Sequence, residues 1–382
     1  MKRNSQIGTG RFSAKPEKLD SLFPSTMLPV AEIKAAVTRA AAEAGFELVG
    51  IAAIDDAPEL EYFPRWIAEG HAGEMKYLEA RDEQGRLKRA SLAHAVPWAR
   101  SVVVCAINYN TAQPYSTQAR PEDAGRGWIS RYAWGQPDYH DAVMPRLRRV
   151  EAAVRNACRS DDPITRCYVD TGPIVERVAA KYAGIGWIGK NTCIINQKLG
   201  SWLFLGVILT SLDLAPDLPA PDRCGTCTRC IDACPTDALI APYQLDSNKC
   251  IAYLTIEKRG ALPQDDKLRS GMGRHLFGCD ICQDVCPWNR QAPATSAAEF
   301  QAREELVNPA LDWLAEMSAE EFRRTFRRSP VRRAKRAGLR RNAVIAMGNS
   351  GDRKFLPLLD RLARDEDEVV AESAAWAVRK LT

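Results

Sequence analysis

Residues 224–235 read CGTCTRCIDACP, and this stretch decides the fold of the region around it. Its spacing, C-x2-C-x2-C-x3-C-P, is the pattern by which bacterial iron–sulfur proteins bind [4Fe-4S] clusters. The first three thiolates, Cys224, Cys227 and Cys230, are separated by two residues each and wrap three corners of one cubane. The fourth, Cys234, follows three intervening residues and points away, and Pro235 terminates the turn. In two-cluster proteins this fourth cysteine ligates the other cluster.

A second cysteine set follows and ends in the same way. Cys279, Cys282 and Cys286, with Pro287, repeat C-x2-C-x3-C-P, but 28 residues separate the leading Cys250 from Cys279. Zinc ribbons also use paired C-x2-C, yet the two C-x3-C-P endings have no purpose in a zinc site. The crossover pattern predicts two ligand sets: Cys224, Cys227, Cys230 and Cys286 for cluster one, and Cys234, Cys250, Cys279 and Cys282 for cluster two.

Twelve cysteines in a chain whose first 28 residues carry no apolar secretory signal argue against a disulfide framework, because the cytosol keeps thiols reduced. We therefore expect a cytoplasmic protein. No run of about 18 apolar residues occurs, which disfavours a membrane span. The four remaining cysteines lack ligand spacing and are interpreted as buried small apolar residues: Cys105, Cys158, Cys167 and Cys193.

The 382 residues are enough for two or three domains, and the sequence predicts an α+β multidomain fold. Strands expected at 46–53, 101–107 and 202–210, with helices expected at 31–44 and 173–183, favour an α/β-layered domain before the cysteines. The predicted divisions are a flexible tail at 1–28, this layered domain at 29–215, a ferredoxin-like domain at 216–291 and a basic helical domain at 292–382.

The C-terminal block is rich in Ala, Leu and Arg and contains a weak internal repeat at an offset of 31 residues. A period near 30 with two helices per unit is typical of HEAT-like helical repeats. The positions that correspond are Leu339, Ala343, Ala346 and Met347 in the first unit and Val370, Ala374, Ala377 and Val378 in the second.

Two cubanes predict electron transfer, and the rest of the chain must supply the terminal acceptor. Residues 184–189, GIGWIG, match G-x-G-x-x-G, but they follow a predicted helix rather than a strand, so no dinucleotide site is expected there. Asp170 ends a predicted strand just before a Thr-Gly-Pro turn. An aspartate at such a position is commonly a helix cap, which is the structural alternative to a catalytic role.

Four further segments accompany the cysteine motifs: ISRYAWGQPDYH at 129–140, YVDTGPIVERVAAKYAGIGWIGKNT at 168–192, GSWLFLG at 200–206 and CIAYLTIEKRG at 250–260. Together they resemble the epoxyqueuosine reductases, the cobalamin-dependent enzymes of queuosine biosynthesis. The order and spacing of the segments agree with that family over about residues 30–380. The chain departs from it in GQPDYH, which is one residue longer than the usual turn, and in the tail before Pro29.

The resemblance implies reduction of the epoxide of epoxyqueuosine, at the wobble position of tRNA, to queuosine. Electrons would pass from an external donor, such as a ferredoxin, a flavodoxin or another reductase, through both clusters to cobalamin. It implies Asp170 as the proton donor and a cobalamin without a histidine ligand to cobalt, since no D-x-H-x-x-G motif is present. The residues implied as cobalamin contacts are Arg89, Tyr132, Asp170, Arg177, Cys279 and Asp280.

A basic run favours the RNA partner that the resemblance implies. Residues 323–341 contain ten Arg or Lys and no acid, within a chain of net charge +5. The plain alternative is a solvated helix face, but a run this dense can neutralise several phosphates. The sequence predicts a monomer that binds the tRNA anticodon stem–loop, with a flipped-out wobble base. The predicted contacts are Arg259, Arg332, Arg333, Lys335, Arg336, Arg340 and Arg341.

Two other functions stay open at this point. A cobalamin-free, ferredoxin-type electron-transfer protein explains the clusters but neither Asp170 nor Arg177 nor the basic run. A corrinoid reductive dehalogenase of a small molecule needs no basic helical domain, and such enzymes are usually exported. Bound corrinoid separates the reductase from the electron carrier, and tRNA binding separates it from the dehalogenase.

Overall fold

The computed structural model describes residues 30–118, 121–156 and 163–382. The tail predicted at 1–28 and Cys158 lie outside the described residues. The N-terminal part is built on one antiparallel sheet with strand order β1-β2-β7-β4. Its strands are β1 (Leu48–Ala53), β2 (Ser101–Asn108), β4 (Thr165–Tyr168) and β7 (Leu203–Thr210). These agree with the strands expected from the sequence, to within two residues at each end of β1, β2 and β7.

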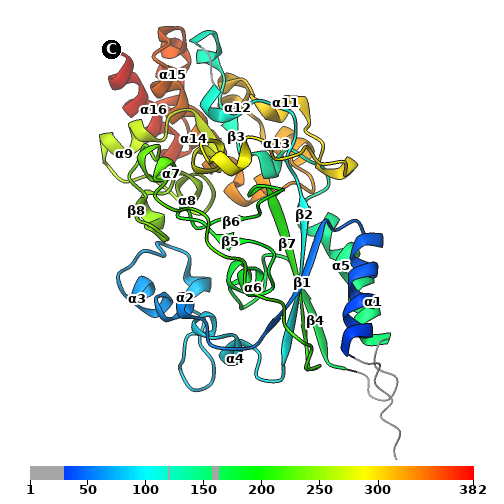
Figure 1. Cartoon of the computed structure of the whole chain (residues 1–382). Helices are drawn as coiled ribbons and strands as arrows, with labels where there is room; N and C mark the ends of the chain where they lie inside the picture. The colour runs from blue at the N-terminus through cyan, green and yellow to red at the C-terminus, as the bar shows by residue number, and fades with distance from the viewer. Residues whose placement is uncertain (1–29, 119–120, 157–162) are drawn as a thin grey trace, which may run out of the picture.

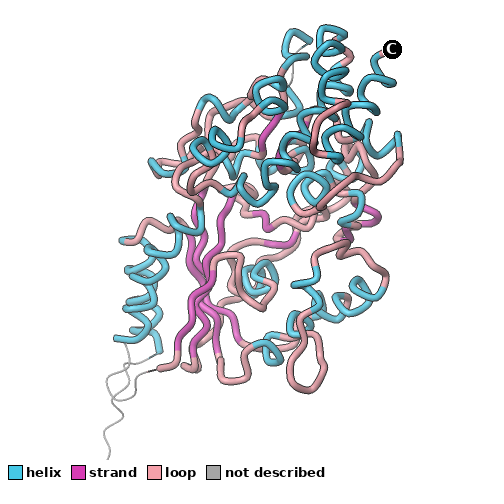
Figure 2. The backbone as a smooth tube through the Cα atoms, turned by 180° about the vertical axis from the view of Figure 1, so that it is seen from behind, coloured by secondary structure: helices cyan, strands magenta, loops and turns pink. Residues whose placement is uncertain are grey.

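Helices cover both faces of this sheet, which explains why its central strands are apolar throughout. Every residue of β2 is buried, and its Ser101 pairs with Ala53 of β1 and Thr210 of β7. Helices α1 (Val30–Glu43) and α5 (Tyr139–Asn156) pack on one face (Figure 1). The other face is covered by α6 (Glu176–Tyr182) and the short α2 (Pro58–Glu61) and α4 (Leu92–Ala95). Figure 2 shows the strands as one twisted layer between these helices.

Three two-stranded pairs connect the sheet to the rest of the chain. In the first, β3 (Trp128–Ile129) runs parallel to β10 (His275–Phe277), so a segment from the N-terminal part pairs with the cysteine-rich region. The antiparallel pairs are β5 (Trp187–Ile188) with β6 (Ile194–Ile195), and β8 (Leu239–Ala241) with β9 (Gln244–Leu245).

The cysteine-rich region contains only short helices, whereas the C-terminal part also contains two long ones, α14 (Lys335–Ser350) and α16 (Glu368–Leu381). The helices of the cysteine-rich region are α7 (Arg229–Asp232), α8 (Ile251–Ile256), α9 (Asp266–Gly271) and α10 (Ile281–Asp284), and α3 (Phe63–Ala68) lies earlier in the chain. The shorter helices of the C-terminal part are α11 (Glu304–Val307), α12 (Leu311–Glu316), α13 (Ala319–Thr325) and α15 (Leu356–Leu362). Within the described residues, no helix is long and apolar enough to span a membrane.

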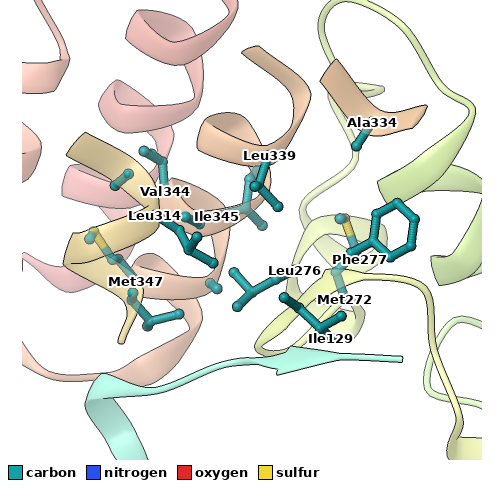
Figure 3. Packing of buried hydrophobic residues seen from close by; sticks show 14 of the residues in the cluster. Ile129, Met272, Leu276, Phe277, Leu314, Ala334, Leu339, Val344, Ile345 and Met347 are labelled. Carbon is teal, nitrogen blue, oxygen red and sulfur yellow. The ribbon is translucent and has the colours of Figure 1, made fainter. Parts of the chain in front are cut away.

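One hydrophobic core runs across the division predicted at 291/292. Leu276 and Phe277 of β10 and Ile129 of β3 face Leu339 and Ile345 of α14 in the same cluster (Figure 3). Burying such side chains stabilises the fold by about 1.5–3 kcal/mol each. The cysteine-rich and C-terminal parts therefore stabilise one another, and the predicted domain limits do not coincide with separate cores.

The repeat positions of the C-terminal part do share one role. Leu339, Ala343, Ala346 and Met347 on α14, and Val370, Ala374 and Ala377 on α16, are buried, and Val378 packs against the same core. Their small side chains allow α14 and α16 to approach closely. Cβ of Ala377 would lie 2.9 Å from a side chain added at Gly348. A HEAT-like repeat stays a prediction.

Candidate active site

The eight motif cysteines gather into two groups. Burial raises the pKa of the Cys286 thiol to about 11, and the nearby Cys224 and Cys230 thiols add to this shift. Cys230 likewise faces Cys224 and Cys227. Around Cys279, burial raises the thiol pKa well above its ordinary value, and Cys250 and Cys234 act in the same direction.

Cys282 joins this second group, with Cys279 and Cys250 as electrostatic neighbours. Among the described residues, no three His, Cys, Asp or Glu side chains are close enough to hold a single metal ion.

Backbone N–H groups converge on several of these sulfurs. The Ala238 N–H donates to Cys234 Sγ at 3.3 Å. Burial raises the pKa of Cys250, which caps α8, while the N–H groups of Tyr253 and Ala252 lower it. Hydrogen bonds of this kind favour the charged thiolate, which is the form that ligates iron.

The loop between β5 and β6 holds both cysteine groups. Lys190 Nζ donates to the carbonyl oxygens of Gly225 at 2.7 Å and Cys227 at 3.1 Å, in the loop of group one. Asn191 Nδ2 donates to the carbonyl of Cys282 at 3.2 Å, in group two. The glycine-rich segment that begins at 184–189 therefore positions the loops of both cysteine groups rather than a nucleotide.

Cys193 is not the inert apolar residue predicted from its spacing. Its thiol donates to the Asn191 carbonyl at 3.8 Å and lies next to the thiol of Cys282, which lowers its pKa, and the guanidinium of Arg177 lies near it. No spacing rule includes Cys193, because the loop between β5 and β6 brings it to group two from a distant part of the sequence.

Asp170 lies in the segment between β4 and α6. Its backbone φ is 55°, a left-handed conformation that few non-glycine residues adopt. The Asp170 N–H donates to Glu176 Oε1 at 2.9 Å, and Tyr139 Oη donates to Asp170 Oδ2 at 2.9 Å. The helix predicted from Pro173 begins at Glu176, with Val175 at its N-cap, so Asp170 does not cap it. The carboxyl group is exposed, and its bond to the Tyr139 phenol fixes its orientation.

Glu176 is a member of this site that the sequence reasoning missed. Burial raises its pKa to about 8, and the neighbouring Asp170 charge adds to the rise. Protonated Glu176 keeps its carbonyl oxygen as an acceptor for the Asp170 N–H. Its position one residue before Arg177 was visible in the sequence, but its burial depends on the fold around it.

The predicted cobalamin contacts Arg89, Tyr132 and Arg177 surround Asp170. Arg89 donates to the carbonyl oxygens of Tyr77 at 2.9 Å and Gly172 at 2.8 Å. Burial raises the pKa of Tyr132 well above its ordinary value, with Asp170 as the next cause. Arg177 donates to the Thr192 carbonyl at 2.6 Å, and so spans from α6 to the residue beside Cys193.

The Asp280 side chain is held inside the protein, and its place near the corrin stays a prediction. Its carboxylate is 6% exposed and accepts hydrogen bonds from Ser130 Oγ and, at 2.6 Å, from the Arg131 N–H. The Arg131 guanidinium in turn lies 4.7 Å from the centre of the Trp134 ring. Asp280 therefore fixes the start of α10, between Cys279 and Cys282, from inside the protein.

The seven predicted tRNA contacts divide by exposure. Arg259, Arg332, Arg333 and Lys335 are exposed, and Arg336 is half-buried with its Nε bonded to the Met317 carbonyl. Arg333 pairs with Glu257 and lies over the ring of Tyr77, near Asp170. Arg333, in the middle of the basic run, therefore lies near Asp170.

Arg340 and Arg341 are buried, and their prediction as tRNA contacts is wrong. Arg340 is 5% exposed and pairs with Asp365. Arg341 is 1% exposed and donates to the carbonyls of Leu254 at 2.6 Å, Lys258 at 3.0 Å and Gly260 at 2.8 Å. Both lie where α14 enters the core, so their charges hold neighbouring segments together.

We expect Arg341→Ala to lower the free energy of unfolding by roughly 3 kcal/mol, because it leaves three carbonyl groups without their donor, that of Leu254 fully buried and those of Lys258 and Gly260 partly buried. The control is Arg332→Ala, an exposed change that should stay within about 0.5 kcal/mol of the parent chain. Urea denaturation followed by circular dichroism measures both. Equal midpoints for the two variants would contradict the role given to Arg341.

Comparison with known proteins decides the family. A model described as "Epoxyqueuosine reductase QueG, DUF1730" matches residues 89–171, and one described as "4Fe-4S double cluster binding domain" matches residues 223–289. The epoxyqueuosine reductase of Xanthomonas campestris pv. campestris is 39% identical over 339 residues, covering 88% of this chain and 93% of that protein. The chain belongs to the epoxyqueuosine reductase family.

Other epoxyqueuosine reductases extend the match. The enzyme of Escherichia coli K12 is 36% identical over 88% of this chain and 86% of its own length. A crystal structure of an epoxyqueuosine reductase with an epoxyqueuosine-modified stem–loop of tRNA-Tyr superposes with a TM-score of 0.80, at 32% identity, over 92% of this chain and 91% of that one. The structure from Streptococcus thermophilus gives 0.78 at 29% identity, over 92% and 90%.

The family membership establishes an oxidoreductase with two [4Fe-4S] clusters, as the cysteine spacing predicted. It does not favour the alternatives of a ferredoxin-type carrier or a small-molecule dehalogenase. A further epoxyqueuosine reductase structure, from Bacillus subtilis, is described with its catalytic aspartate loop swung out of the active site. In the present chain, the Asp170 loop is fastened by its bonds to Glu176 and Tyr139.

Proposed function

We propose that this chain reduces the epoxide of epoxyqueuosine in tRNA to queuosine, using two [4Fe-4S] clusters and cobalamin. The observation that carries the proposal is the connection between the acid and the second cysteine group. Glu176 has both Asp170 and Arg177 as charged neighbours, Arg177 binds the Thr192 carbonyl, and the adjoining Cys193 lies next to Cys282. A redox cofactor in this region lies between the source of electrons and the source of protons.

The two cysteine groups supply the ligand sets of the proposal. Cluster one takes Cys224, Cys227, Cys230 and Cys286, and cluster two takes Cys234, Cys250, Cys279 and Cys282. Their thiols are neighbours within each group, as described above. Cluster two is the one next to Asp170, so electrons pass from cluster one to cluster two and then to the cofactor.

The residues around Asp170 fit cobalamin. Arg89, Arg177 and Tyr132 provide hydrogen-bond donors at an exposed carboxyl group, and they suit the amide and phosphate groups of a corrinoid. When bound, cobalamin supplies the low-potential electrons that open the epoxide.

The overall reaction consumes two electrons and two protons: the epoxide becomes an alkene, and its oxygen leaves as water. Asp170 delivers a proton to that oxygen, and the Tyr139 hydroxyl holds the carboxyl group toward it. Glu176 fixes the Asp170 backbone from behind. Because burial raises the pKa of Glu176 to about 8, this second carboxyl retains a proton at neutral pH.

The basic face formed by Arg259, Arg332, Arg333 and Lys335 binds the anticodon stem–loop in this proposal. Arg333 is an electrostatic neighbour of Asp170, so this basic face extends to the catalytic site. A wobble base that is flipped out of its stack can then reach Asp170. A tRNA substrate implies work in the cytoplasm, and the proposed chain acts as a monomer.

Removing these charges should weaken RNA binding in a salt-dependent way. For Arg332→Ala/Arg333→Ala/Lys335→Ala we expect lower affinity for the stem–loop, and a slope of log affinity against log salt that is shallower by roughly two. Fluorescence anisotropy at several salt concentrations gives the slope. Arg39→Ala, an exposed change on α1, is the control. An unchanged slope in the triple variant would place the RNA elsewhere.

Turnover itself is tested by nucleoside mass spectrometry. The full chain, reconstituted with iron, sulfide and cobalamin, is incubated under anaerobic conditions with a chemical reductant and tRNA that contains epoxyqueuosine. We expect a product nucleoside lighter by one oxygen, and none when cobalamin is left out. A fully loaded protein that leaves epoxyqueuosine intact would refute the proposal.

A further inference from the structure

The loop of cluster one faces solvent, unlike that of cluster two. Gly225 and Thr226, between Cys224 and Cys227, are exposed, and a Cβ added at Gly225 would meet no atom within 4 Å. By contrast, Cys250 and Cys279 pack against the large core around β10. The rate of electron transfer falls steeply with distance, so this exposed loop is where an external donor comes closest to a cluster.

A groove of about 480 Å³ opens beside this loop. Arg229 and Arg290 line it on opposite segments, one from α7 and one following Cys286, together with Asp232, Ala233, Asp284 and Val285. Arg223 precedes the first ligand, Cys224. The three arginines are exposed, and none has a hydrogen-bond or ion-pair partner within the described ranges.

Two exposed carboxylates share this surface. Asp232 accepts a hydrogen bond from Thr228 Oγ1 at 2.8 Å. Asp222 accepts from the Cys224 N–H at 2.7 Å and from the Tyr243 hydroxyl. Asp284, the other carboxylate that lines the groove, is buried. The exposed arginines Arg223, Arg229 and Arg290 therefore outnumber the exposed carboxylates, which leaves an excess of positive charge around the cluster-one loop.

We propose that Arg223, Arg229 and Arg290 form the docking surface for an acidic one-electron carrier protein that reduces cluster one. The inference rests on the proposed function for the presence of the clusters. Charge complementarity at a rim speeds encounter and selects the partner, and electron-transfer interfaces are small and transient. RNA is the other polyanion to consider, but its substrate base must reach Asp170, which neighbours cluster two.

The docking step is a single electron transfer. With the anionic hydroquinone of a flavodoxin as donor, the flavin loses one electron and becomes the neutral semiquinone, and cluster one goes from the 2+ to the 1+ state. The surface arginines take no part in the bond changes. They bring the flavin edge to the Gly225 loop.

The test compares Arg229→Glu/Arg290→Glu with the parent chain, both holding two clusters and no cobalamin. Stopped-flow bleaching of the cluster absorbance measures reduction by flavodoxin hydroquinone, and calorimetry measures its binding. At low salt we expect the second-order rate constant to fall about tenfold or more, together with the affinity and most of the salt dependence. Arg39→Glu on α1 should change neither.

Two further measurements keep the outcomes distinct. Reduction by the uncharged deazariboflavin radical should be unchanged in the charge-reversal pair, as should stem–loop binding. Equal flavodoxin rates in variant and parent would overturn the proposal, and so would a parallel loss of RNA affinity, because the groove would then hold RNA. If the Arg229→Glu/Arg290→Glu protein contains less iron than the parent, the same rates are compared for Arg229→Gln/Arg290→Gln. Loss of tRNA turnover with intact docking would refute only the proposed function.

Discussion

Asp170→Asn should lose most turnover while the protein keeps its iron, its cobalamin and its RNA affinity. The amide preserves an acceptor for the Tyr139 hydroxyl, and the bond from the Asp170 N–H to Glu176 is unaffected because it involves the backbone. What disappears is the proton. General acid catalysis typically contributes about 10²–10⁴-fold, so the single-turnover rate should fall within that range.

Two companion variants define the result. Tyr139→Phe removes one hydrogen bond to Asp170 and should slow the reaction by about tenfold or less, since a typical hydrogen bond contributes about 1 kcal/mol. Asp213→Asn, an exposed change past the end of β7 that lies away from Asp170, should behave like the parent. A fully active Asp170→Asn chain would remove Asp170 from the mechanism.

Paired cysteine substitutions should reveal the crossover of the ligand sets. Cys224→Ala/Cys286→Ala combines residues from different motifs but, in our assignment, from one cluster. It should therefore retain about four irons per chain. Cys282→Ala/Cys286→Ala combines neighbours in one motif that serve different clusters, and it should retain almost none. Both pairs should abolish turnover, because each breaks the electron path.

Iron analysis and the visible spectrum of anaerobically reconstituted protein distinguish the alternatives. If each motif held its own cluster, the two results would be exchanged: the neighbouring pair would keep about four irons and the pair from different motifs almost none. The matched control is Cys105→Ala, at a buried position in β2 that belongs to neither group, and it should keep about eight.

Local sequence rules predicted the parts of the site that depend on local geometry. Each C-x3-C-P ending has its first cysteine on a short helix, Cys230 on α7 and Cys282 on α10, and its second just beyond that helix. The strands 101–107 and 202–210 are apolar enough to be buried on both faces. The role of Asp170 came from a family resemblance, and the structure adds its left-handed backbone and its phenol partner.

Features that depend on tertiary contacts were not predictable in this way. Charge density in residues 323–341 gave no sign that α14 enters the core, where Arg340 and Arg341 bind a carboxylate and carbonyl groups. The same applies to Cys193, which reaches Cys282 through a loop, and to Glu176, which is buried by segments distant in sequence. Spacing along the chain carries no information about such contacts.

The most direct test of the account is the metal content of the whole chain after anaerobic reconstitution with iron, sulfide and cobalamin. Elemental analysis, after removal of unbound cofactor, should give about eight irons and one cobalt per chain, as two cubanes and one corrinoid require. Eight irons with no retained cobalt would contradict the site assigned around Asp170. Zinc in place of iron would contradict the account from its first cysteine onward.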